Sequence, residues 1–302
     1  FFTDQLNQSG DVGALVRSIL QSPEFQARET QFAAAYFGGG GTPIGGAMTR
    51  TGVRLVLDRD GPLGRAGQTL LVPDDRVILP ALLAEGGWNT QHLAMLADRI
   101  DPARNYTLID IGANIGLFAR QVLQAFDNVA ACHCIEPDPG NFDALRYNLA
   151  DYPGVQIHPF GLGAADGTAR FFRDRENCGN HSVHADAMRD RPFTETTVTI
   201  RAAGAWLTGA LVEAGPLLWK SDTQGNDEII VAATPWPVWR RVEFAMIELW
   251  RIRKDATVPR GFLDRVADMP HRRLGGQAVS ADTVAEYLSG DDWAHDDLFL
   301  WR

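Results

Sequence analysis

The sequence predicts an α/β fold with a doubly wound, mostly parallel sheet. Short, uninterrupted apolar runs in the middle of the chain have the length of buried parallel strands. Stretches in which apolar residues recur at helical spacing alternate with these runs, and glycines mark the first strand-to-helix turn. The predicted strands cover 108–111, 129–135 and 155–159, and the predicted helices cover 117–126 and 139–149.

The region before this core divides into two predicted parts. Asp11 as a helix cap and the run SPE at 22–24 as a second helix start predict a small helical unit, which the four glycines at 38–41 follow as a flexible joint. This segment resembles a short bacterial helical module of unknown function. Strand-like alternation then predicts a β-hairpin, with helices from about 80 and 90. We therefore expect three parts: a helical extension with a glycine-rich linker at 1–46, a hairpin and helical cap at 47–105, and the main domain at 106–302.

The second half of the chain is predicted to complete the sheet. A turn at Asp166-Gly167 precedes an added strand, and residues 173–194 are polar and irregular. Further predicted strands cover 168–172, 196–200, 217–221, 244–249 and 297–301, and further helices cover 229–233 and 262–267.

Composition restricts the partners and the compartment. The 302 residues contain 28 Lys and Arg against 38 Asp and Glu, and a net charge of −10 argues against a nucleic-acid substrate. No apolar segment reaches the length of a membrane span and no signal peptide is visible. Three cysteines cannot build a disulfide framework, so we expect a cytoplasmic protein. The chain begins with Phe1 rather than Met, which leaves upstream signals open.

The run Cys132-His133-Cys134 invites a metal-site interpretation, but its geometry opposes one. Alternate residues of a strand face opposite sides, so His133 is expected to point away from both cysteines. We see no further ligands at zinc-site spacing, and we expect no metal here. Buried core thiols are the preferred interpretation.

The turn that follows the first strand of the core predicts a nucleoside site. Gly112 and Gly116, with Asn114 between them, lead from the strand into a helix, where a ligand can approach the main chain. Glu136 ends the next strand, 20 residues beyond Gly116, and can accept hydrogen bonds from two ribose hydroxyls. Asp110 suits a ligand that carries a positive centre.

The glycine spacing favours S-adenosylmethionine over NAD. The loop lacks the close glycine pair of a dinucleotide fingerprint, G-x-G-x-x-G, which seats a pyrophosphate. A ligand that has a ribose and a positive centre but no phosphate is S-adenosylmethionine.

Four motifs carry a family resemblance. IDIGANIG, IEPDPGNFDALRYNL, VQIHPFGLGAADGTARFF and LLWKSDTQGNDEII resemble, in this order, motifs of the FkbM family of S-adenosylmethionine-dependent methyltransferases. The resemblance covers roughly residue 74 to the C-terminus. It implies a class I methyltransferase fold with an antiparallel strand pair at the sheet edge, and a sugar or glycolipid hydroxyl as acceptor. The predicted cofactor contacts are Asp110, Gly112, Ala113, Asn114, Gly116, Glu136, Pro137, Phe160 and Gly161.

The predicted catalytic residues come from three places. Asp222 ends a strand at the same sheet edge as Gly112, and it can act as a base or cap the next helix, with Lys220 as a partner in the same motif. That motif resembles the family's K-I-D-V-x-G-x-E, with Ser221 and Asp227 as departures. His181 has an ordinary pKa suited to proton removal, although a surface histidine is the preferred interpretation without geometry. Glu248 is predicted at the same rim, where it can orient a hydroxyl or, together with Asp222, join a Mg²⁺ ion, although we do not expect a metal to be required.

Three functions therefore stay open. The first is an O-methyltransferase acting on a sugar or glycosylated metabolite, the second is a non-catalytic cofactor- or glycan-binding module of a glycan-assembly protein, and the third is an NAD-dependent oxidoreductase. The expected partner is a small-molecule or carbohydrate acceptor. A homo-oligomer is compatible with the sequence.

Overall fold

The computed structural model of this chain describes residues 48–49, 52–57, 60–73, 75–212, 214–251, 258–290 and 292–302. The predicted N-terminal helical unit and glycine run lie outside the described residues. The chain divides into two compact units, with the boundary between Trp88 and Asn89.

The first unit contains a small antiparallel sheet. Its strands are β1 (Met48–Thr49), β2 (Gly52–Val56) and β3 (Thr69–Val72), in the order β1-β2-β3. The antiparallel pairing of β2 with β3 confirms the predicted hairpin. Helix α4 (Ile78–Glu85) follows, and Gly86 ends it in the left-handed conformation that glycine tolerates.

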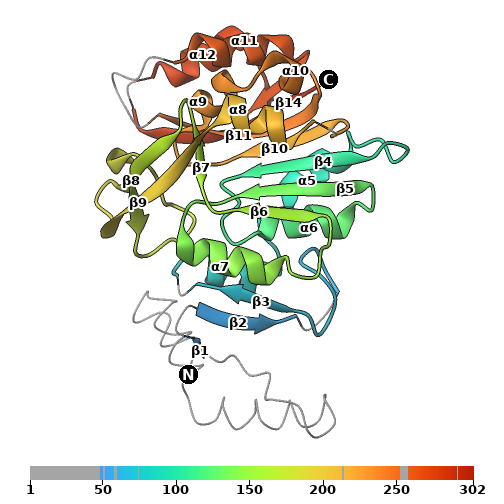
Figure 1. The fold of residues 1–302 in the computed structure, drawn as a ribbon, viewed down its shortest axis with the longest axis vertical. Helices are drawn as coiled ribbons and strands as arrows, with labels where there is room; N and C mark the ends of the chain where they lie inside the picture. The colour runs from blue at the N-terminus through green and yellow to red at the C-terminus, as the bar shows by residue number, and fades with distance from the viewer. Residues whose placement is uncertain are drawn as a thin grey trace, which may run out of the picture. The chain divides into compact units, whose positions relative to one another are not determined.

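The second unit is built on an eight-stranded sheet in the order β13-β12-β14-β11-β10-β4-β5-β6 (Figure 1). Five neighbouring strands are parallel, and β14 runs antiparallel between β11 and β12. The predicted fold class and the antiparallel pair at the sheet edge are therefore confirmed. The strands are β4 (Tyr106–Ile111), β5 (Val129–Ile135), β6 (Val155–His158), β10 (Leu217–Ser221), β11 (Val242–Arg251), β12 (His271–Leu274), β13 (Gln277–Ala278) and β14 (Ala294–Trp301).

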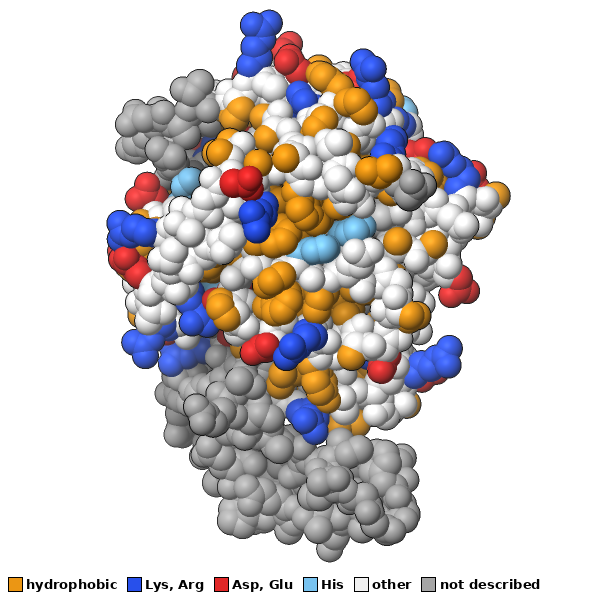
Figure 2. Space-filling view, in the orientation of Figure 1, with side chains coloured by type: hydrophobic (Ala, Val, Ile, Leu, Met, Phe, Trp, Pro, Cys, Tyr) orange, Lys and Arg blue, Asp and Glu red, His pale blue; other side chains and the backbone are white. Residues whose placement is uncertain are grey.

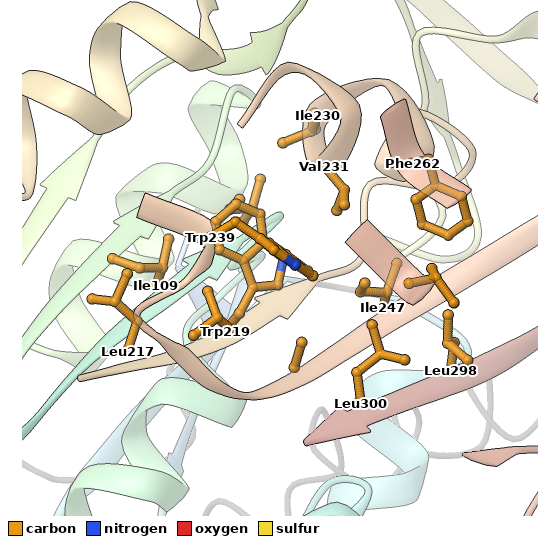
Figure 3. Close-up of a cluster of buried hydrophobic side chains, with 14 of the residues drawn as sticks. Ile109, Leu217, Trp219, Ile230, Val231, Trp239, Ile247, Phe262, Leu298 and Leu300 are labelled. Carbon is orange, nitrogen blue, oxygen red and sulfur yellow. The ribbon is translucent and has the colours of Figure 1, made fainter. Parts of the chain in front are cut away.

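Residues that alternate along each strand are buried in two hydrophobic clusters, one on each face of the sheet, as a doubly wound fold requires. Ile109 and Trp219 belong to one cluster, and their neighbours Leu108 and Leu218 to the other. The first cluster (Figure 3) packs against α8 (Ala203–Ala210), α9 (Asp227–Ala233), α10 (Trp236–Trp239), α11 (Arg260–Asp268) and α12 (Ala281–Leu288). The second packs against α5 (Thr90–Ala97), α6 (Leu117–Ala125) and α7 (Pro139–Asn148).

A second, three-stranded sheet follows β6 in the chain. It comprises β7 (Gly161–Gly163), β8 (Gly167–Asp174) and β9 (Phe193–Ala202) in the order β7-β9-β8. The segment predicted as irregular is shorter than expected, because β8 and β9 pair up to Asp174 and Phe193 and a 3₁₀ turn, η1, covers Ala185–Met188.

Seven of the described elements of the second unit were not predicted: β7, η1, α8, α10, β12, β13 and α12. Helix α8 has glycines in its sequence and no side-chain cap, so local signals for it are weak. Strand β12 reads HRRL, in which only Leu274 is apolar and buried. None of the described helices is long and apolar enough to cross a membrane.

Candidate functional site

Strand register aligns the predicted site residues along one edge of the sheet. Ser221 is opposite Ile111 on one side and Ile247 on the other, and Ile111 is opposite Ile135. The residues that come next along the four strands are Asp222, Gly112, Glu248 and Glu136. Parallel strands end together at their carboxyl edge, which is where open α/β sheets bind ligands.

The glycine bend, which we define as residues 112–116, joins β4 to α6. Gly112 and Gly116 have φ of 71° and 83°, values that favour glycine. A Cβ on Gly112 would collide with the Asp222 carbonyl oxygen, and one on Gly116 would lie 2.8 Å from Leu145 Cδ1. Close packing therefore requires both glycines. It also places the backbone of Asp222 directly against the bend.

Four backbone N–H groups of the glycine bend donate hydrogen bonds within the protein. Those of Gly112 and Ala113 donate to the Ile135 carbonyl, and that of Gly116 donates to the Ala113 carbonyl. The Asn114 N–H donates to Glu136 Oε2 at 2.9 Å. A pyrophosphate cradle needs such N–H groups free to donate to the ligand, so the bend suits a ligand without phosphate.

Glu136 is buried beside the bend. Its Oε1 accepts from the Asp138 N–H at 2.8 Å, so each carboxylate oxygen has a backbone donor. Burial raises the pKa of Glu136 to about 8. These two bonds hold the carboxyl group in one orientation, and each oxygen keeps a lone pair for a further donor such as a ribose hydroxyl.

Lys220 ties the strands beneath the bend. It lies opposite Asp110 in the register, and its Nζ is 3.1 Å from Asp110 Oδ1 and donates to the Gly112 carbonyl at 2.6 Å. Burial disfavours the charged lysine, but Asp110 and Asp222 outweigh it and raise its pKa. Burial raises the pKa of Asp110, against the opposing effect of Lys220. The cation that Asp110 contacts in this structure is therefore Lys220.

The carboxylate pair, Asp222 and Glu248, is bridged by an amide that the sequence did not single out. Gln224 Nε2 donates to Asp222 Oδ1 at 2.6 Å and to Glu248 Oε2 at 2.7 Å. His295 Nδ1 is 3.5 Å from the other oxygen of Glu248. Burial, followed by the charge of Asp222, raises the pKa of Glu248 well above its ordinary value. The pair can therefore accept hydrogen bonds and hold a proton.

The segment 174–184, between β8 and η1, contacts both halves of the site. The Cys178 carbonyl accepts from the side-chain amides of Asn114 and Asn141. At the other end, Ser182 Oγ donates to the Gln224 carbonyl at 2.7 Å. Buried Asp174 organises the turn between them by accepting from the backbone N–H groups of 176 and 177.

His181 lies within this segment but faces its own turn. Its Nδ1 accepts from the Asp174 N–H at 3.1 Å, and its ring packs edge-on against Phe171. Burial lowers the pKa of His181 to about 4. Within the described part of the chain, no contact joins His181 to Asp222 or Glu248, so the structure does not bring the predicted catalytic residues together as one set.

The remaining predicted contacts lie at the ends of β5 and β6. Gly161 begins β7, and a Cβ there would lie 2.9 Å from Ile200 Cδ1 and 3.7 Å from Pro137 Cβ. The ring of Phe160 is half-buried, with its centroid 5.5 Å from that of Trp206. These residues form an apolar wall next to Glu136.

The prediction that His133 points to the opposite face of the strand from Cys132 and Cys134 is confirmed. Both cysteines belong to the cluster under α6, with their sulfurs 3.4 Å apart, whereas His133 packs with His158 and Trp206. Figure 2 shows histidine side chains on the surface, bordered by hydrophobic ones. Among the described residues, no group of three or more His, Cys, Asp or Glu is arranged to hold a metal ion.

Comparison with known proteins finds likeness in fold alone. No protein-family model matches the sequence, and no curated protein matches it either. Methyltransferase FkbM from Methylobacillus flagellatus KT is 13% identical with a TM-score of 0.37, over 65% of this chain and 44% of that one, so the chain spans less than half of that protein. The bifunctional kinase-methyltransferase WbdD is 13% identical with a TM-score of 0.37, over 74% of this chain and 41% of that one. The N-terminal domain of human METTL16 is 12% identical with a TM-score of 0.37, over 77% and 74%. Likeness at this level carries no argument about activity.

Proposed function

We propose that this protein is an S-adenosylmethionine-dependent O-methyltransferase that acts on a hydroxyl of a sugar or glycosylated metabolite. The observation that supports the proposal most is the row of Glu136, Gly112, Asp222 and Glu248 at the carboxyl edge of four adjacent strands. In this proposal, the nucleoside would bind at the ends of β4 and β5, beside the acidic groups of β10 and β11. We further propose that the protein acts in the cytoplasm, in keeping with its three buried cysteines, which are too few for a disulfide framework.

The glycine bend fits adenosine better than a dinucleotide. Glu136 would accept the ribose hydroxyls, and the wall of Pro137 and Phe160 would contact the adenine. Because the N–H groups of Gly112, Ala113, Asn114 and Gly116 already donate within the protein, a pyrophosphate has few donors here. This disfavours the NAD-dependent oxidoreductase.

The acceptor side would supply position and a proton acceptor. S-adenosylmethionine, when bound, supplies a methyl group activated by a sulfonium. A sugar hydroxyl attacks in line and must lose its proton, and Asp222 is the more exposed member of the carboxylate pair, with 35% of its side chain accessible. Glu248, with 15% accessible, would accept a hydrogen bond from the same acceptor. Lys220 keeps the strand that carries Asp222 fixed to the bend.

Calorimetry on the whole chain tests the cofactor. We expect S-adenosylmethionine to bind, and Glu136→Ala to weaken binding about 10-fold or more because the ribose hydroxyls lose an acceptor worth about 1.5 kcal/mol. Glu195→Ala is the matched control, because Glu195 is an exposed carboxylate on β9 that pairs with Arg170. No heat from the wild-type protein with S-adenosylmethionine, while its circular dichroism shows a fold, would refute the proposal.

Methyl transfer separates the proposed enzyme from the non-catalytic module. Incubation with methyl-labelled S-adenosylmethionine and a panel of sugar nucleotides and polysaccharide fragments should label one acceptor, and Asp222→Asn should reduce the rate about 10²–10⁴-fold. Cofactor binding without any labelled acceptor, and unchanged by Asp222→Asn, would favour the binding module. Nicotinamide fluorescence that responds to the protein would favour the oxidoreductase.

A further inference from the structure

We propose that Gln224 is the positioning residue of the acceptor site, fixing the orientation of Asp222 and Glu248 relative to each other so that Asp222 meets the acceptor hydroxyl. This inference rests on the proposed function. It concerns a residue that neither the predicted catalytic set nor the predicted cofactor set contains.

The side-chain amide nitrogen of Gln224 uses both of its hydrogens, one for each carboxylate of the pair. Nε2 is 2.6 Å from Asp222 Oδ1 and 2.7 Å from Glu248 Oε2, and a primary amide has two N–H donors, one for each carboxylate. Asp222 follows β10 and Glu248 lies in β11, so the amide spans two neighbouring strands. Each carboxylate keeps its second oxygen for another partner.

Gln224 itself is held rigidly. It is 7% exposed, and its φ of 56° is a left-handed value that is uncommon for a residue other than glycine. Its carbonyl accepts from the hydroxyl of Ser182, which is fully buried and bonded through its backbone to Phe172 of β8. The side chain therefore starts from a fixed backbone, and its reach to both carboxylates is set by the fold.

The charged groups around the carboxylate pair show why the pair needs the hydrogen bonds of the Gln224 amide. Lys220 Nζ is 3.9 Å from the second oxygen of Asp222, and His295 lies 3.5 Å from Glu248. Buried Asp227, at the start of α9, also disfavours the negative charge of Glu248, whereas Trp250 of β11 favours it. Without the two amide donors, the two carboxylates would face each other with less to offset their like charges, and the loop would no longer fix their orientation.

Two variants test the assignment in the full-length chain. Gln224→Leu keeps the side-chain size and removes both donors, and Gln224→Asn keeps an amide that is one methylene too short to bridge the pair. We expect both to lower kcat about 10-fold or more, and to move the acidic limb of the pH–rate profile up by about one unit, as the base loses a donor that favours its charged form. The dissociation constant of S-adenosylmethionine should stay within about 2-fold, because the Glu136 contacts are unchanged. Gln156→Leu, at an exposed position of β6, is the control.

The outcomes separate this inference from the proposed function. If the variants lose S-adenosylmethionine affinity and rate together, with the acidic limb unmoved, Gln224 is only structural and the inference fails. If the wild-type chain neither binds nor transfers, the proposed function fails. Carbon-13 NMR titration of the Asp and Glu carboxyls then still decides the geometric claim: two signals should titrate at higher pH in Gln224→Leu, and unchanged titration would overturn it. Should Gln224→Leu not fold, Gln224→Asn gives the same readings.

Discussion

The two halves of the site differ in what holds them. The glycine bend is closed by backbone hydrogen bonds and by packing that leaves no room for a Cβ, and it lies within one strand–turn–helix unit. The carboxylate pair is held by side chains, with an amide from one loop joining carboxylates of two strands and a hydroxyl from a third segment bracing the amide. Because backbone hydrogen bonds hold the cofactor half, its geometry is rigid. Because side chains hold the acceptor half, a single substitution can change the positions of its carboxylates.

Lys220→Met should have the largest effect, because Lys220 serves both halves. Its loss leaves buried Asp110 without a cation and frees the Gly112 carbonyl. Breaking a buried pair in this way costs about 3–5 kcal/mol, which urea denaturation monitored by circular dichroism should show as a lower free energy of unfolding.

The double variant Lys220→Met with Asp110→Asn is the control for this prediction. It removes the uncompensated charge, so part of the lost stability should return, and the coupling energy of the cycle should be about 1 kcal/mol or more. Additive losses would show that the two residues do not depend on each other.

Gly112→Ala should damage the bend and, through it, the acceptor half. The added Cβ collides with the Asp222 carbonyl at a φ of 71°, so we expect about 2–4 kcal/mol of destabilisation and at least 10-fold weaker S-adenosylmethionine binding. Gly167→Ala is the matched control, because a Cβ at Gly167 meets nothing within 4 Å. Equal effects of the two substitutions on unfolding would contradict the close packing of Asp222 on the bend.

The same difference explains what the sequence could predict. The sequence predicts Gly112, Gly116 and Glu136 because strand ends, glycines and a spacing of 20 residues are local signals. The strand register then places these residues at one edge of the sheet. Asp222 and Glu248 were found in the same way, as acidic residues near strand ends. The contacts within the carboxylate pair were not predictable.

Gln224 shows why those contacts were missed. A glutamine in a loop has no periodicity or spacing that marks it. The contacts of Gln224 depend on its left-handed backbone conformation and on Glu248, which lies 24 residues further along the chain. His181 shows the reverse: its residue type suggested a base, but burial and the Asp174 N–H decide its state. Helix α12 was missed although Ser280 caps it by accepting from the Thr283 N–H, a signal present in the sequence.

Glu136 and Glu228 offer a comparison of two buried acids, one beside the glycine bend and one in the first turn of α9. Burial raises the pKa of both to about 8, but Glu136 has a donor on each oxygen whereas Glu228 Oε1 has none in the described structure. The folded state binds protons that the unfolded state releases above about pH 4.5, so stability from both acids is present at low pH and is lost as the pH rises towards 8.

Replacement by glutamine should therefore change the free energy of unfolding differently at the two positions. Glu228→Gln should raise the free energy of unfolding by about 1–2 kcal/mol at pH 8.5, since no buried charge forms, and should flatten its pH dependence between 5 and 8. Glu136→Gln should lower it by about 1 kcal/mol at pH 5, because the amide nitrogen cannot accept from a backbone N–H. Urea denaturation across this pH range measures both, and an equal change in the free energy of unfolding at pH 5 for the two variants would contradict the difference in hydrogen bonding.

His181→Asn should have the smallest effect, and it tests whether the segment 174–184 contributes chemistry or only shape. With a pKa lowered to about 4, His181 is neutral throughout the range from pH 5.5 to 8, and its Nδ1 is occupied by the Asp174 N–H. Asparagine offers an acceptor of similar reach, so we expect kcat within about 3-fold of wild type, an unchanged pH–rate profile, and about 1 kcal/mol of lost stability. Asp222→Asn provides the contrast in the same assay. Loss of the acidic limb in His181→Asn alone would instead make His181 the base, and the acceptor half would then be organised around the segment 174–184 rather than around the amide of Gln224.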